Sequence, residues 1–116
     1  MNQEYKILIL EDIPDDAELV EQELKKVIKN YALQVTDNEK GFVKALKTYK
    51  PDLILADYSL PQFTGMKAIK LTKEISPLIP VIIVTGSLNE ELAVECIKAG
   101  AKDYVLKKTS PGLVRL

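Results

Sequence analysis

Four short apolar runs in the sequence each lead to a residue that could take part in chemistry. Glu11 and Asp12 follow the first run, Asp57 follows the second, Thr85 closes the third and Lys107 closes the fourth. Carboxylates held close together repel one another unless a cation offsets their charge. Oxygen ligands of this kind suit Mg²⁺, which uses one or two protein carboxylates and leaves positions for phosphate oxygens. The residue types therefore indicate a metal-assisted phosphoryl site, if the runs end at the same place in the fold.

Composition excludes many other kinds of site. The 116 residues contain 0 His and 1 Cys, which rules out disulfides, zinc sites built from Cys and His, and Ser-His-Asp catalysis within the chain. A net charge of -1 gives no reason to expect binding to nucleic acid or to an anionic membrane. With 47% hydrophobic and 28% charged residues, the chain is expected to form one globular domain over residues 1–116.

The elements that would hold these residues alternate between strand and helix. The apolar runs are rich in β-branched residues and lack polar alternation, as in strands buried on both faces of a parallel sheet. Between them, helical spacing predicts helices near 15–30, 42–49, 66–75 and 89–100, and a shorter strand near 33–35 is expected at a sheet edge. This order predicts a doubly wound α/β domain with a five-stranded parallel sheet.

Such a sheet brings the candidate residues together. Ligands of open α/β sheets bind at the carboxyl ends of the strands. Glu11, Asp12, Asp57, Thr85 and Lys107 all stand at the ends of predicted strands, so one rim of the sheet would carry three carboxylates, a hydroxyl and an ammonium group. Each residue alone could be an ordinary loop or strand-end residue. The placement of all five at the ends of predicted strands indicates a functional site.

Taken together, these stretches resemble the receiver domain of two-component response regulators. The resemblance is carried by ILILED at 7–12, PDLILADYSLPQFTG at 51–65, PVIIVTGS at 80–87 and AGAKDYVLK at 99–107. It implies a flavodoxin-like sheet with strand order 2-1-3-4-5, an order that comes with the family and not from the residues.

The resemblance also implies roles for individual residues. Asp57 is similar to the phosphoacceptor, and Glu11 and Asp12 are similar to the acidic pair that holds Mg²⁺. Asp12 would then be a direct ligand and Glu11 a water-mediated one, with the backbone carbonyl of Ser59 completing the protein's ligands. The remaining roles fall on Thr85 as the switch hydroxyl, Lys107 as the phosphate-pairing lysine and Tyr104 as the switch aromatic.

Partners follow from the same family. A histidine kinase or a histidine phosphotransfer protein would supply the phosphoryl group, and the face formed by the fourth helix and the fifth strand would contact an output domain or partner protein. The expected chemistry is limited to self-catalysed phosphotransfer and autodephosphorylation, with no stand-alone enzyme. The sequence has no membrane-length apolar run and no signal-like start, so a cytoplasmic location is expected.

Two features depart from the family pattern. Lys108 stands where a proline commonly follows the key lysine, so a trans peptide is expected there. Ser110 and Pro111 resemble the start of a fifth helix, which Leu116 cuts short. The parent protein could therefore be longer, such as a regulator with an effector domain or a hybrid histidine kinase. Self-association through the sheet face left bare is a further expectation.

Two alternative functions stay open at this point. A haloacid-dehalogenase-like phosphatase also uses an Asp after a parallel strand with Mg²⁺, but it needs a second Asp where Ser59 stands. A receiver-like module could instead bind proteins without being phosphorylated. A nucleotide-binding domain is less well supported, because no Gly-rich loop follows the first strand.

Overall fold

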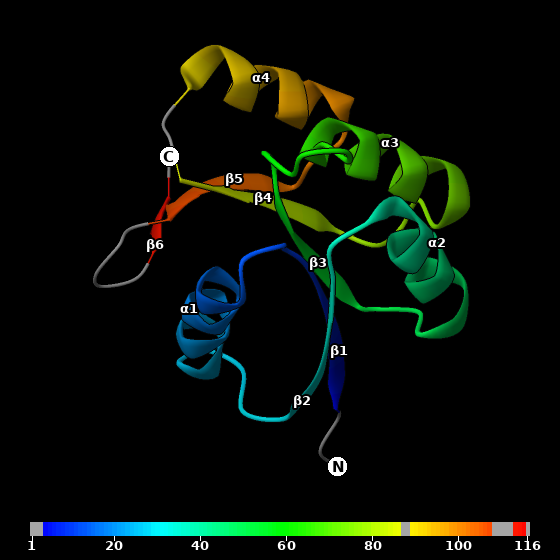
Figure 1. Cartoon of the computed structure of the whole chain (residues 1–116), viewed down its shortest axis with the longest axis vertical. Coiled ribbons are helices and arrows are strands. Elements are labelled where there is room, and N and C mark those ends of the chain that lie inside the picture. The colour runs from blue at the N-terminus through cyan, green and yellow to red at the C-terminus, as the bar shows by residue number, and fades with distance from the viewer. Residues whose placement is uncertain (1–3, 87–88, 108–112, 116) are drawn as a thin grey trace.

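A central parallel sheet organises the chain (Figure 1). The computed structural model describes residues 4–86, 89–107 and 113–115. The strands are β1 (Tyr5–Leu10), β2 (Tyr31–Thr36), β3 (Leu53–Asp57), β4 (Val81–Thr85), β5 (Asp103–Lys107) and β6 (Leu113–Arg115). The helices are α1 (Pro14–Lys25), α2 (Glu39–Thr48), α3 (Gly65–Ile75) and α4 (Glu90–Ala99).

The strand order is β2-β1-β3-β4-β5-β6, and the first five strands pair in parallel. The predicted order 2-1-3-4-5 is therefore confirmed, with β2 at one edge as expected. Helices cover both faces, which is why the strands carry the apolar runs 7–10 in β1, 53–56 in β3 and 81–84 in β4 (Figure 1).

Two apolar clusters form the core, one on each face of the sheet. On one face α2, α3 and α4 pack over alternate strand residues such as Leu8, Ile54 and Ile83. On the other face α1 packs over the intervening residues, among them Ile9 and Val84. The period-two alternation of strand side chains thus gives each helix layer its own set of contacts.

Helix α4 is bounded by capping residues at the two ends of the range predicted for it. The Asn89 side chain accepts a hydrogen bond from the Leu92 amide, and Gly100 ends the helix with a left-handed φ of 118°. Helix α1 begins at Pro14 as predicted, but it ends at Lys25 and not near Asn30. Val27, which continues the apolar spacing of α1 beyond the end of the helix, is 77% exposed. A tight turn in which the Val27 and Ile28 amides both donate to the Leu24 carbonyl replaces the last helical turn.

The C-terminal segment differs from the expected start of a fifth helix. Ser110 and Pro111, where that helix was expected to begin, lie outside the described residues, as does Lys108. Leu113–Arg115 forms β6, which pairs antiparallel with β5. The β5 edge offers unpaired backbone groups that an added strand can satisfy.

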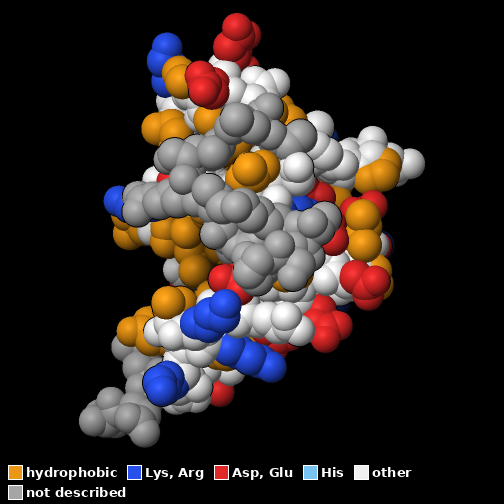
Figure 2. Space-filling view, turned by 90° about the vertical axis from the view of Figure 1, so that its left-hand side faces the viewer, with side chains coloured by type: hydrophobic (Ala, Val, Ile, Leu, Met, Phe, Trp, Pro, Cys, Tyr) orange, Lys and Arg blue, Asp and Glu red, His pale blue; other side chains and the backbone are white. Residues whose placement is uncertain are grey.

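The side of the sheet next to α1 is incompletely covered. Ile82 and Val105, on neighbouring strands, are only partly buried, and hydrophobic side chains show on this side of the molecule (Figure 2). Leu113–Arg115 pairs with the edge of β5, and self-association through this face stays a prediction. Within the described residues, no helix has the length and apolar character needed to cross a membrane.

Candidate functional site

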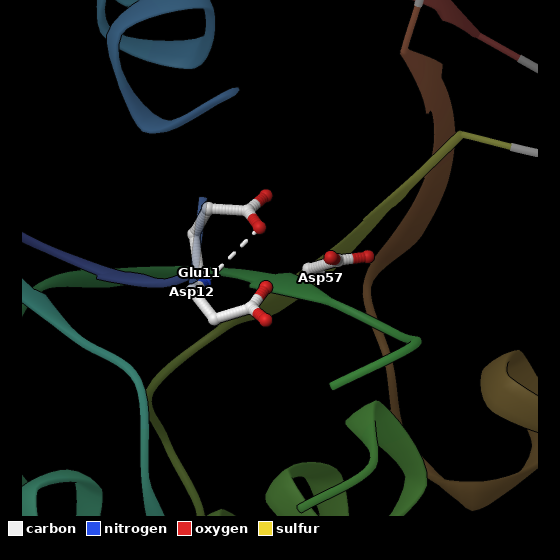
Figure 3. A group of neighbouring side chains, drawn as sticks. All are labelled: Glu11, Asp12 and Asp57. Carbon is white, nitrogen blue, oxygen red and sulfur yellow. Dashed lines mark hydrogen bonds between the residues drawn. The ribbon is translucent and has the colours of Figure 1, made fainter. Parts of the chain in front are cut away.

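The ends of β1 and β3 bring three carboxyl groups to one place (Figure 3). Glu11 and Asp12 directly follow β1, and Asp57 is the last residue of β3, the strand that pairs with β1. One carboxyl oxygen from each of the three residues lies within 4.8 Å of the others. Glu11 and Asp57 are buried, whereas Asp12 is exposed. The predicted acidic cluster is therefore present, and its exposed member opens it to solvent.

Glu11 is held in place by its neighbours. Its Oε2 accepts hydrogen bonds from the backbone amides of Asp12 at 3.1 Å and Ile13 at 3.3 Å. Its Oε1 accepts a hydrogen bond from the Lys107 ammonium at 2.9 Å. Burial raises the pKa of Glu11 to about 6, although the hydrogen bond from Lys107 counteracts part of this effect. Glu11 is therefore a fixed carboxylate whose charge the protein offsets only in part.

Lys107 lies at the centre of the negative charges. Its Nζ donates to Glu11 and, at 2.8 Å, to Asp16 Oδ2, and it lies 3.8 Å from Asp57 Oδ2. Burial favours the neutral amine, but the hydrogen bonds to Asp16 and Glu11 outweigh it, so the pKa of Lys107 is raised. Lys107 is therefore charged at neutral pH and is positioned beside the Asp57 carboxylate.

Asp57 is bound from its own loop. Its Oδ1 accepts a hydrogen bond from the Ser59 amide at 3.3 Å, while Oδ2 faces Lys107. The loop that carries Ser59 is anchored to the core by Leu60 and by Phe63, whose ring packs edge-on against Phe42 with centroids 5.3 Å apart. The carboxylate thus projects from a strand end and a loop that are both fixed by packing.

Thr85 and Tyr104 form a second pair beside this cluster. Thr85 ends β4 and is buried, and Tyr104 of β5 is buried on the face covered by α4. Burial raises the pKa of Tyr104, and the nearby Thr85 side chain opposes this effect. Within the described part of the chain, Thr85 forms no side-chain hydrogen bond with Glu11, Asp12 or Asp57, so the predicted residues form two adjoining groups.

The acidic cluster matches what Mg²⁺ requires. Bonds of about 2.1 Å put opposite ligands of an octahedral ion about 4.2 Å apart. The nearest oxygens of the three carboxylates lie within 4.8 Å of one another, which is close to this spacing. Lys107 is the only cation in contact with them among the described residues, so the cluster keeps an excess of negative charge.

Comparison with known proteins identifies the family of the chain. The family model of the response regulator receiver domain matches residues 7–115. The chain belongs to this family. The receiver domain is 32% identical over 105 residues to the chemotaxis protein CheY of Thermotoga maritima, a match that covers 88% of each chain. It is 36% identical over 109 residues to the transcriptional regulatory protein YdfI of Bacillus subtilis, covering 90% of this chain and 49% of YdfI.

Solved structures agree with the assignment. The signal receiver domain of a LuxO repressor protein from Vibrio parahaemolyticus superposes with a TM-score of 0.79 at 27% identity, covering 92% of this chain and 80% of that one. The Mn²⁺-bound form of response regulator Rcp1 gives a TM-score of 0.77 at 27% identity, covering 91% and 83%. Because the chain belongs to the receiver family, the alternative of a haloacid-dehalogenase-like phosphatase is no longer supported.

One residue of the site was not singled out from the sequence. Asp16 lies in the first turn of α1, where its carboxylate shares the Lys107 ammonium with Glu11. Its position next to Pro14 and Asp15 indicates only an acidic helix start, which is favourable at any helix N-terminus. The sequence contained no signal that pairs Asp16 with Lys107, because the two residues lie 91 positions apart.

Proposed function

We propose that this receiver domain accepts a phosphoryl group on Asp57 and transmits the modification through its surface. The observation that carries the proposal is the position of the Asp57 carboxylate, beside Glu11 and Asp12 and 3.8 Å from the Lys107 ammonium. Phosphoryl transfer needs an in-line nucleophile and positive charge around the transferred oxygens, and a site of this kind supplies both. We take residues 1–116 as one receiver domain.

In the proposed reaction, an Asp57 carboxylate oxygen attacks phosphorus. The O–P bond forms as the N–P bond of a phosphohistidine breaks, and the imidazole leaves and takes up a proton. Lys107 pairs with one of the phosphoryl oxygens as their charge develops. Mg²⁺ held by Asp12, Asp57 and the Ser59 backbone carbonyl, with Glu11 acting through water, would neutralise further charge on the phosphoryl group. A histidine kinase or histidine phosphotransfer protein is the proposed donor.

We propose that phosphorylation of Asp57 changes the surface of the domain through Thr85 and Tyr104. Thr85 stands at the end of β4, next to the site, and the buried Tyr104 hydroxyl has no hydrogen bond of standard geometry within the described residues. A phosphoryl oxygen that draws in the Thr85 hydroxyl would change the space available to the Tyr104 ring. Such a coupled side-chain pair can convert a local charge change into a change of surface.

The output surface is proposed to be the face of α4 and β5. A groove on this face is lined by Ala93, Val94, Ile97 and Tyr104, with charged residues at its border. Val94 and Ile97 are 53% and 46% exposed, which is unusual for large apolar side chains on a helix. An output domain or partner protein would bind there, and self-catalysed hydrolysis of the aspartyl phosphate would end the signal.

The central test is the substitution Asp57→Asn. The wild-type chain, incubated with acetyl phosphate and Mg²⁺, should gain the mass of one phosphoryl group, and the variant should gain none because an amide is a far poorer nucleophile. Asp52→Asn makes the same change at the other end of the β3 segment, where Asp52 accepts a hydrogen bond from the Lys6 amide, and it should be labelled normally.

Two results would contradict the proposal. Undiminished labelling of Asp57→Asn would place the phosphoryl group elsewhere. A wild-type chain that neither acetyl phosphate nor phosphoramidate labels would favour a protein-binding module that acts without phosphorylation.

A further inference from the structure

The Lys107 ammonium is shared between two carboxylates on the α1 side of the site. It donates to Glu11 Oε1 at 2.9 Å and to Asp16 Oδ2 at 2.8 Å. Lys107 is buried, with 8% of its side chain exposed, whereas 36% of the Asp16 side chain is exposed. Asp15, Asp16 and Lys107 line the same cleft between α1 and the strand ends. Asp16 is therefore a partly exposed residue of α1 that contacts the buried lysine.

These contacts leave one of the three N–H groups of Lys107 for Asp57. The distance from Nζ to Asp57 Oδ2 is 3.8 Å, which is short enough for ionic attraction but too long for a hydrogen bond. Glu11 and Asp16 hold the ammonium by charge-assisted hydrogen bonds, which are about twice as strong as neutral ones. Lys107 is thus held close to the carboxylate without covering its oxygen.

This spacing matters because Asp57 needs both of its oxygens. In the proposed reaction one oxygen forms the bond to phosphorus and the other contributes to the metal site. Oδ1 already accepts a 3.3 Å hydrogen bond from the Ser59 amide. A direct hydrogen bond from Lys107 to Oδ2 would engage the second oxygen and lower its reactivity.

We propose that Asp16 is a positioning residue that keeps the Lys107 ammonium from closing on Asp57 before the phosphoryl group arrives. This inference rests on the proposed phosphorylation of Asp57. Asp16 balances the attraction of Asp57, so that the free N–H of Lys107 meets an incoming phosphoryl oxygen in the space between Nζ and Oδ2. Without Asp16, Lys107 keeps Glu11 and takes Asp57 as its second partner.

The first test compares initial rates of labelling by acetyl phosphate at saturating Mg²⁺. Misplacing a reacting group by about 1 Å can cost up to about a hundredfold in rate. We expect Asp16→Ala to be about tenfold slower than wild type and Asp16→Asn to be about threefold slower, because the amide oxygen still accepts a hydrogen bond. Asp15→Ala removes a neighbouring charge from the same helix turn and cleft, and it should be labelled at the wild-type rate.

A second measurement does not depend on labelling. A crystal structure of Asp16→Ala without metal should place Lys107 Nζ within hydrogen-bond distance of Asp57 Oδ2, closer than the 3.8 Å seen here. In a Lys107→Ala background, adding Asp16→Ala should change the labelling rate by less than about twofold, because the residue through which Asp16 acts is gone.

The outcomes separate this inference from the proposed function. Failure of the wild-type chain to be labelled would contradict phosphorylation, and the crystal structure would still decide whether Asp16 positions Lys107. Equal rates for wild type and Asp16→Ala, an equal loss in Asp15→Ala, or an unchanged Lys107 position would each overturn the inference.

Discussion

Lys107 donates a 2.9 Å hydrogen bond to Glu11, a residue that lies 96 positions earlier in the chain. The two residues stand at the ends of β5 and β1, and β3 and β4 lie between these strands in the sheet. Both side chains are almost fully buried. The bond therefore connects the ends of β1 and β5, with the Lys107 ammonium 3.8 Å from Asp57 Oδ2.

This connection distinguishes the two acidic residues that follow β1. Glu11 accepts hydrogen bonds from Lys107 and from two backbone amides, whereas Asp12 is exposed, which fits the direct metal-ligand role proposed for it. Asp12→Ala should weaken Mg²⁺ binding by about a hundredfold, and Glu11→Ala by about tenfold, as for loss of an outer-shell contact. Metal titration of both variants would make the comparison. Equal effects would show that the direct and water-mediated roles are wrongly assigned.

Gly65 begins α3 where a larger residue would have to push its neighbours aside. A Cβ atom there would lie 3.0 Å from the Tyr58 Cα and 3.1 Å from the Ile83 Cδ1, and the Gly65 amide donates to the Tyr58 carbonyl. Gly65→Ala should lower the free energy of unfolding by about 1–3 kcal/mol through overpacking. Urea denaturation would measure it. At Gly86 a Cβ would meet nothing within 4 Å, so an equal loss in Gly86→Ala would contradict the steric explanation.

Lys50, which follows α2, has a left-handed backbone. Its φ of 53° makes it the one non-glycine residue with positive φ in the described part of the chain. Glycine adopts this conformation at no steric cost, so Lys50→Gly should raise the free energy of unfolding by up to about 1 kcal/mol. Lys47→Gly, within the last turn of α2, should lower it by about 0.5–1 kcal/mol. Thermal unfolding would compare the two variants, and a loss of stability in both would exclude backbone strain at Lys50.

Cys96 provides a test of packing beneath α4. The thiol is fully buried, and burial raises its pKa, so less thiolate is present at a given pH than in an exposed cysteine. At pH 8 the native protein should react with iodoacetamide at least about a hundredfold more slowly than the urea-unfolded chain, where the ordinary pKa returns. Mass spectrometry would follow the modification. Similar rates in the two states would show that α4 opens readily.

Local sequence determined much of the fold. The β-branched runs predicted the buried strands, and Asn89 and Gly100 marked the ends of α4, because capping and strand burial depend on neighbouring residues. The placement of Glu11, Asp12 and Asp57 at one rim followed from parallel pairing alone, since parallel strands end on the same side.

Other features were decided only by tertiary structure. Val27 fits the apolar spacing of α1, but the helix ends at Lys25 and a turn follows it, so Val27 is exposed. The strand β6 forms because β5 has a free edge, which no local pattern in Leu113–Arg115 reveals. The contact between Asp16 and Lys107 joins residues 91 positions apart. Such pairs depend on where a helix turn meets a strand end in space, and the spacing of residues along the chain does not record that distance.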